Sequence, residues 1–178
     1  MKIARSLLAG MFIFTSLSIH AQTPQDELDV IEAALKAQFE NIMPYVESWV
    51  VSSSTEALTP GAERSAFVRV SEDFARRNEK PLTISAVELA PGAVFDDLSQ
   101  FTTEAGFDWE AFERLHPGAD TYIVRVARPG FYGVDGAVVR MDIQRGSGNG
   151  RSVTAQLIVD RSEGEWNVVG GEFPAVRP

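Results

Sequence analysis

The last third of the chain alternates apolar and polar residues, and this alternation constrains the fold more than any other feature of the sequence. It covers four segments: residues 122–127, 137–143, 153–159 and 166–168. A period of two is typical of strands that bury one face. Glycine-containing turns separate the segments, at residues 130–136, 146–150 and 162–164. The pattern predicts a four-stranded antiparallel meander at the C-terminal end.

The region before the meander begins with the pattern of a long helix. Thr23 offers a capping hydroxyl, Pro24 suits the first helical position, and Pro44 ends the pattern. The apolar residues between them recur at helical spacing: Leu28, Ile31, Leu35, Phe39 and Ile42. Acidic residues in the first turn suit the positive end of the helix dipole. We expect this helix to lie with one face on the sheet.

The middle of the chain predicts short elements. Branched and aromatic residues indicate strands over residues 45–51, 66–70 and 82–89. Ser71 is expected to cap a short helix to about Asn78, and Asp108 to cap another that ends before Pro117-Gly118. Residues 94–101 carry a weak helical pattern and are ambiguous.

Together these elements predict an α+β fold, in which a long N-terminal helix and short helices pack on a mostly antiparallel sheet. A curved sheet around the helix, as in cystatin-like and nuclear-transport-factor-like folds, fits the order of elements. No repeat or break divides the sequence, so residues 22–178 are expected to form one globular domain.

Residues 1–21 have the pattern of a secretory signal peptide. Lys2 and Arg5 precede an apolar stretch over residues 7–19, and Ala21 follows as a small residue suited to cleavage. The stretch is shorter than the roughly 20 apolar residues that span a bilayer. Met11 stands where a lipoprotein would carry its lipid-bearing cysteine. We therefore expect a periplasmic or secreted protein with no membrane anchor after cleavage.

The composition narrows the classes of partner. The chain has a formal net charge of −9, and Lys2 and Arg5 lie inside the expected signal peptide, so the mature protein is more acidic still. Such a surface repels nucleic acid and anionic lipids. The chain has no cysteine, so core packing rather than disulfides must stabilise it.

Several motifs of the C-terminal half resemble a recurrent type of uncharacterised secreted bacterial protein. They are the aromatic helix over residues 109–116 that runs into Pro117-Gly118, the Arg-Pro-Gly-Phe sequence at 128–131, and the closing Gly164, Trp166, Val168 and Val169. Similar proteins often carry a cysteine pair near the turn at 146–150, which this chain lacks. The resemblance covers less than half of the mature chain. It implies no activity and no catalytic residue.

The residue types exclude several chemistries. His116 is the one histidine beyond residue 21, and a role in satisfying the last carbonyls of its helix is the expected one. No Gly-x-Ser-x-Gly sequence accompanies it. One histidine without cysteine does not make a zinc or copper site, and no calcium-loop pattern is present. We expect no metal, no cofactor and, on balance, no enzymatic activity.

Four residues are candidates for ligand binding. Arg125 and Arg140 fall on the polar side of their strands and could hold a small anionic ligand, although a cross-strand network of ion pairs predicts the same pattern. Trp109 and Tyr132, with Trp166, could stack on a sugar, although core packing explains the same residues. The sequence predicts a non-enzymatic binding or envelope accessory module with an anion or protein as partner. A carboxylate-dependent hydrolase or lyase of an envelope polymer and a protein-binding inhibitor remain the alternatives.

Overall fold

The computed structural model describes residues 22–42, 48–58, 68–89, 91–117, 121–145 and 152–172. The expected signal peptide at residues 1–21 lies outside the described residues, as do Gly118 and the turn at 146–150. None of the helices in the described ranges is long and apolar enough to cross a membrane.

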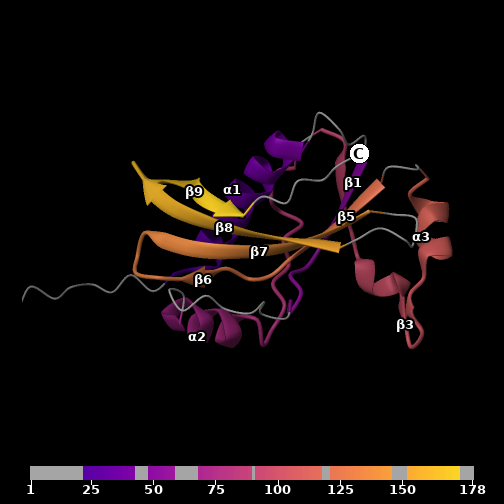
Figure 1. Ribbon diagram of the computed structural model, residues 1–178, viewed down its shortest axis with the longest axis horizontal. Coiled ribbons are helices and arrows are strands. Elements are labelled where there is room, and N and C mark those ends of the chain that lie inside the picture. Colours follow the sequence, from indigo (N-terminus) through magenta and orange to yellow (C-terminus); the bar gives the residue numbers. More distant parts are fainter. Residues whose placement is uncertain are drawn as a thin grey trace, which may run out of the picture.

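A seven-stranded mixed sheet forms the centre of the fold (Figure 1). Its order is β2-β1-β5-β7-β8-β9, and β6 also pairs with β7. The strands are β1 (Ser48–Ser52), β2 (Ala93–Asp96), β5 (Thr121–Val126), β6 (Gly130–Phe131), β7 (Gly136–Arg145), β8 (Ser152–Ser162) and β9 (Glu165–Glu172). The pairs from β5 to β9 are antiparallel, whereas β1 runs parallel to both β2 and β5. With the helices, this mostly antiparallel sheet makes the fold α+β.

Helix α1 (Pro24–Ile42) lies against β7, β8 and β9 on one face of the sheet (Figure 1). Its first turn is closed by Thr23, whose Oγ1 accepts from the Asp26 N–H, while Asp26 accepts from the Thr23 N–H. This reciprocal pattern satisfies amides that the first helical turn leaves free. The main core lies between α1 and the sheet, and includes Ile31, Leu35, Phe39, Trp49, Val139, Met141, Ile143, Leu157 and Trp166.

A second core lies at the β1–β5 end of the sheet and contains Val50, Leu98, Phe101, Phe112 and Ile123. The 3-10 helix η3 (Leu98–Phe101), the small hairpin of β3 (Thr102–Thr103) and β4 (Gly106–Phe107), and helix α3 (Trp109–Leu115) supply its outer side chains. Asp108 caps α3 as predicted, with its carboxylate accepting from the Ala111 N–H at 3.0 Å. Because Val50 and Ile123 pack here while Trp49 and Tyr122 enter the main core, β1 and β5 are buried on both faces.

Two of the expected strands in the middle of the chain are wrong. Within residues 66–70 the described part belongs to helix α2 (Val68–Arg77), so Ser71 lies inside the helix and does not cap it. Two valines separated by an arginine are too short a pattern to distinguish a strand from a first helical turn.

The segment 82–89 forms no strand beyond an isolated bridge between Ser54 and Thr83. Its branched residues Ile84 and Val87 belong to a turn, in which the Val87 N–H donates to the Ile84 carbonyl, and their side chains are buried in the main core. The ambiguous residues 94–101 divide into β2 and η3.

Candidate ligand-binding face of the sheet

One face of the sheet carries polar side chains, and we call it the polar face. It consists of Arg125 on β5, Arg140, Asp142 and Gln144 on β7, and Thr154 and Gln156 on β8. The alternate residues of β7, such as Val139 and Met141, point into the main core on the opposite side. Strand register places Arg125 opposite Asp142 and Arg140 opposite Gln156. The structure thus brings both candidate arginines onto one face of neighbouring strands.

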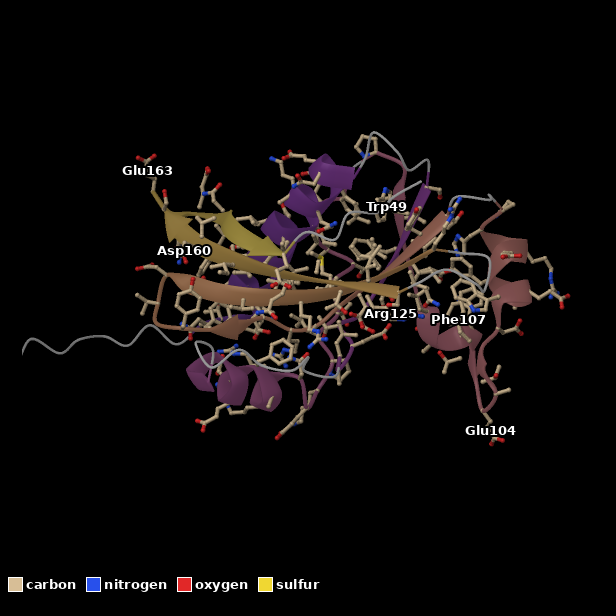
Figure 2. The ribbon with its side chains drawn as sticks, viewed as in Figure 1. Trp49, Glu104, Phe107, Arg125, Asp160 and Glu163 are labelled. Atoms are coloured by element: carbon tan, nitrogen blue, oxygen red, sulfur yellow. The ribbon has the colours of Figure 1, made fainter. Side chains whose placement is uncertain are left out.

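Arg125 already has partners on this face. Its Nε lies 3.3 Å from Glu56 Oε2, and its Nη1 donates to Gln144 Oε1 at 3.2 Å. The guanidinium carbon lies 5.2 Å from the centre of the Phe107 ring, a cation–π distance, and Figure 2 shows the two side by side. The ion-pair alternative therefore describes Arg125, with Glu56 as its partner.

Glu56 reaches Arg125 from the segment that follows β1. Its backbone N–H donates to the Val126 carbonyl at 2.8 Å, which fixes the segment beside the end of β5. Burial raises the pKa of the Glu56 carboxyl, and the negative charge of Asp142 adds to this. Arg125 and a hydrogen bond from Ser52 oppose the rise without cancelling it. Glu56 therefore takes up a proton at a higher pH than an ordinary glutamate does.

Arg140 differs from Arg125, because its side chain has no hydrogen bond or ion pair within the described part of the chain. The side chain is half-buried, and its Nε is buried without an acceptor. Its neighbours across the strands are Gln156 on β8 and Ala127, whose backbone N–H donates to the Arg140 carbonyl and not to its side chain. Asp142, two residues along β7, accepts instead from the Thr154 hydroxyl at 2.7 Å. An Nε–H that loses water without gaining an acceptor costs free energy.

The aromatic candidates do not form one surface. Trp109 packs against Phe107 and Phe112 at ring-centre distances of 4.7 and 5.9 Å, at the edge of the second core. Trp166 is buried against Phe131 in the main core. Tyr132 donates a hydrogen bond to Asp160, and Figure 2 shows Asp160 and Phe107 at opposite ends of the sheet. The structure therefore does not bring Trp109, Trp166 and Tyr132 together on one surface.

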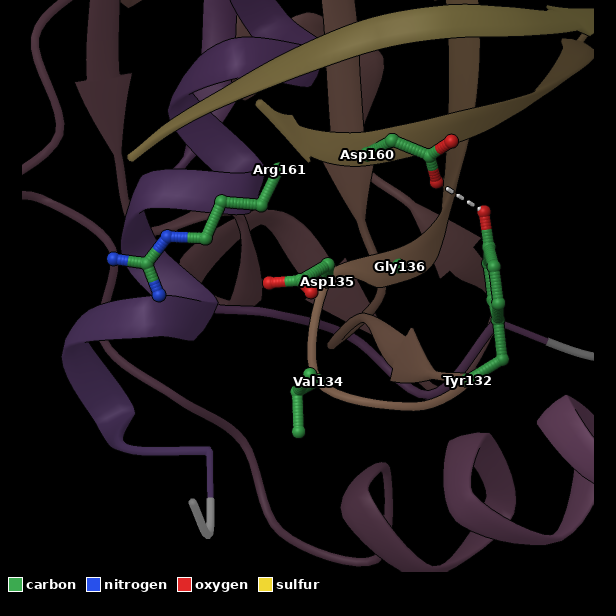
Figure 3. Close-up of a pocket in the computed structure, with 6 residues that line it drawn as sticks. All are labelled: Tyr132, Val134, Asp135, Gly136, Asp160 and Arg161. Carbon is green, nitrogen blue, oxygen red and sulfur yellow. Dashed lines mark hydrogen bonds between the residues drawn. The ribbon is translucent and has the colours of Figure 1, made fainter. Parts of the chain in front are cut away.

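Tyr132 borders a shallow, open depression where β6 meets β7 and β8 (Figure 3). Its other lining residues are Val134, Asp135, Gly136, Asp160 and Arg161. The Tyr132 hydroxyl donates to Asp160 Oδ1 at 2.5 Å, and the ring lies where a Cβ on Gly136 would stand. Residue 136 must therefore be glycine for the ring to keep this position.

The hydroxyl of Tyr132 is expected to ionise only at extreme pH. Burial, the hydrogen bond to Asp160 and the charge of Asp160 raise its pKa to about 12. An absorbance titration of the phenolate band should therefore lose a step near pH 12 when Tyr132 is replaced by phenylalanine. The titration of Tyr132→Phe is subtracted from that of the unmodified protein to isolate the signal of Tyr132. A step in this difference near the ordinary tyrosine pKa of about 10 would contradict the hydrogen bond.

His116 ends α3, but its imidazole does not meet the helix carbonyls. The backbone N–H of His116 donates to the Phe112 carbonyl at 2.9 Å, while the side-chain Nε2 lies 2.7 Å from Asp96 Oδ2. The expected side-chain cap is therefore wrong. The imidazole instead joins α3 to the edge strand β2, with its ring against Phe112.

A buried cluster of charges joins α1, α2 and the β5–β6 connection, and sequence reasoning missed it. Glu27 of α1 is 2% exposed and accepts from Arg128 Nε and Nη2, each at 2.7 Å, and from Arg77 Nη1 at 2.8 Å. Arg77 also pairs with Asp73 at 2.7 Å. The side-chain amide of Asn78 donates to the Arg128 backbone carbonyl and accepts from the Arg128 backbone N–H. Spacing could have indicated Glu27, since it lies one helical turn before the buried Ile31.

Asp73 completes this charge cluster. Burial acts to raise the pKa of its carboxyl, but hydrogen bonds from the Phe131 N–H, Arg77 and Arg76 together lower it below the ordinary value. Arg77 in turn lies 4.7 Å over the Phe131 ring. The buried charged groups of this cluster are hydrogen-bonded to one another, so the cluster joins the helices to the sheet and is not an open binding site.

No protein-family model, curated protein or solved structure matches this chain. Within the described ranges, no group of three or more histidine, cysteine, aspartate or glutamate side chains is placed to hold a metal ion. On the polar face, Arg140 Nε has no acceptor in the part of the chain that the structure describes, whereas the neighbouring Arg125 pairs with Glu56.

Proposed function

We propose that this chain is an exported, non-enzymatic binding module that holds a small anionic ligand on the polar face through Arg140. Residues 1–21 act as the signal peptide that directs it to the periplasm or beyond. The long helix α1 and the C-terminal four-stranded meander serve as the rigid scaffold, and the ligand surface lies on the side of the sheet away from α1.

The observation that supports this proposal is the half-buried side chain of Arg140, whose Nε has no acceptor among the described residues. A carboxylate supplies two acceptors in the geometry of the guanidinium fork, so it satisfies donors that the protein leaves free. Gln156, opposite Arg140 on β8, adds an amide N–H within the same register. The overall acidity of the chain weakens this attraction little, because salt screens charges beyond about 8 Å at physiological ionic strength.

Replacing Arg140 by glutamine is expected to weaken anion binding by about 10- to 100-fold, since a hydrogen bond to a charged group contributes about 1.5–3 kcal/mol. Titration calorimetry measures the binding of acetate, succinate and phosphate to both proteins.

The protein for this experiment also tests export. The full chain is expressed with residues 1–21 in place and is recovered from the periplasmic fraction. Its intact mass then shows whether the signal peptide is cleaved before Gln22.

The matched control is Arg114→Gln, which removes the same charge from an exposed arginine of α3 that pairs with Glu110. This variant should bind like the unmodified protein. If Arg140→Gln binds each probe as well as the Arg114 control does, or if the unmodified protein binds none of them, the proposal is wrong.

A further inference from the structure

We propose that Arg125 is the second cation of this site, and that protonation of Glu56 releases it so that a small dicarboxylate bridges Arg125 and Arg140. This inference rests on the anion binding proposed for Arg140. It adds the ligand class, a dianion with two carboxylates, and a dependence of binding on pH.

The register of β5 and β7 places the two arginines at a suitable spacing. Arg125 lies opposite Asp142, and Arg140 lies two residues from Asp142 along β7 on the same face. Diagonal neighbours of this kind have Cα atoms about 7–8 Å apart. Two guanidinium groups at that spacing fit the two ends of a short dicarboxylate better than they fit a single carboxylate.

Glu56 now occupies the place that one end of this ligand would take. Its Oε2 lies 3.3 Å from Arg125 Nε, and the pair is partly shielded, since the Arg125 side chain is only 17% exposed. Loss of the negative charge on Glu56 leaves Arg125 with Gln144 and the Phe107 ring as its contacts. Those contacts hold the Arg125 guanidinium on the polar face, where it can bind a carboxylate of the dicarboxylate ligand.

The groups around Glu56 determine how readily it takes up a proton. Arg125 of β5 and Ser52 of β1 favour the carboxylate, whereas Asp142 of β7 and burial favour the neutral acid. Asp142 keeps its hydrogen bond to Thr154 on β8, the strand on the side away from Arg125. Of these two acids, Glu56 is the one whose carboxylate contacts Arg125. Protonation of Glu56 is therefore the step that removes the ion pair from the Arg125 guanidinium.

The linkage has a definite sign. A bound dicarboxylate favours neutral Glu56, so the complex takes up a proton and the pKa of Glu56 is higher in the complex than in the free protein. Between these two pKa values the affinity for succinate falls about tenfold for each unit of rising pH. Binding of the dianion therefore strengthens as the pH falls, down to the pH at which the ligand itself takes up a proton.

The test measures succinate and acetate binding by calorimetry between about pH 6.5 and pH 8.5, where both carboxyl groups of succinate are ionised. It compares the unmodified protein, after cleavage of residues 1–21, with two variants. Glu56→Gln carries a permanently neutral side chain, so it should bind succinate with the same affinity across this range and more tightly than the unmodified protein at pH 8. Glu104→Gln removes an exposed acid at the β3–β4 turn and should keep the pH dependence of the unmodified protein. Thermal unfolding of both variants checks that they are folded.

Two results would overturn the inference without touching the role of Arg140. One is a Glu56→Gln variant whose succinate affinity falls with pH as steeply as that of the unmodified protein. The other is acetate binding as tight as succinate binding at about pH 6.5, where succinate is the dianion, which contradicts bridging. If Arg140→Gln leaves binding unchanged instead, the proposed function itself fails.

Discussion

Replacing Glu27 by glutamine is expected to lower the free energy of unfolding by about 3–5 kcal/mol, the cost of removing one partner from a buried ion pair. Glu27 is 2% exposed, and its carboxylate accepts three short hydrogen bonds from Arg77 and Arg128. An amide in its place offers one acceptor and no charge, so Arg128 loses the counter-charge of Glu27 and Arg77 keeps only that of Asp73 among the described residues.

Chemical denaturation with urea measures this loss, and Glu40→Gln is the matched control. Glu40 belongs to the same helix but is exposed, so its replacement should change stability by less than about 0.5 kcal/mol. A Glu27→Gln variant as stable as the Glu40 control would show that the cluster contributes little net stability.

The same cluster should make the fold sensitive to acid. The pKa of Asp73 is lowered in the folded protein, so its contribution is fully present above the ordinary aspartate pKa of about 3.9 and is lost as pH falls through the lowered value. Loss of stability on acidification should therefore continue below pH 4. This direction is opposite to that of Glu56, whose raised pKa makes its carboxylate a cost at neutral pH.

Replacing Phe112 by alanine is expected to cost about 3–5 kcal/mol, the usual range for deleting a fully buried aromatic ring. Phe112 has no exposed surface and contacts four rings, with centre distances of 5.3 Å to Phe101, 5.6 Å to Phe107, 5.9 Å to Trp109 and 4.8 Å to His116. It is the residue that joins α3, η3 and the β3–β4 hairpin to the face of β1 and β5. Its loss leaves a cavity that these short elements cannot close by themselves.

Phe112→Leu is the control for this change, because a volume closer to the original should cost far less than alanine does. Both variants are compared by denaturant unfolding, with circular dichroism as a global probe. The fluorescence of Trp109 is the local probe, measured in a background in which Trp49 and Trp166 are replaced by phenylalanine. Coincident transitions place the second core inside one cooperative unit. An early fluorescence transition places it in a separate one, and a cost below about 1 kcal/mol contradicts the packing described here.

How far the fold could be predicted depends on the range of the forces involved. The α+β class and the Asp108 cap follow from local patterns, since periodicity and capping act within a few residues. The strand predicted at 82–89 failed because Ile84 and Val87 are apolar for a tertiary reason: they fill the main core from a turn. The parallel pairing of β1 with β2 and β5 joins residues far apart in the chain, and no local pattern encodes it.

The candidate site shows the same division. Alternation placed Arg125 and Arg140 on the polar side of their strands, and register then placed them on neighbouring strands of one face. The difference between them is tertiary, because Glu56 reaches Arg125 from a segment anchored to the end of β5, while Arg140 faces Gln156 and the backbone of Ala127. Nothing in the spacing of the sequence distinguishes a paired arginine from an unpaired one.

The sequence by itself determined the composition-based limits on this protein: an acidic, cysteine-free chain with one histidine beyond residue 21, and strands that alternate apolar and polar residues. Those properties depend only on which residues are present and on their neighbours. The tertiary structure alone decided which charges meet. It buried Glu27 against two arginines, paired Arg125 with Glu56, and left Arg140 Nε without an acceptor among the described residues. The reason is that ion pairs form between groups that the fold brings within about 4 Å, whatever their separation along the chain.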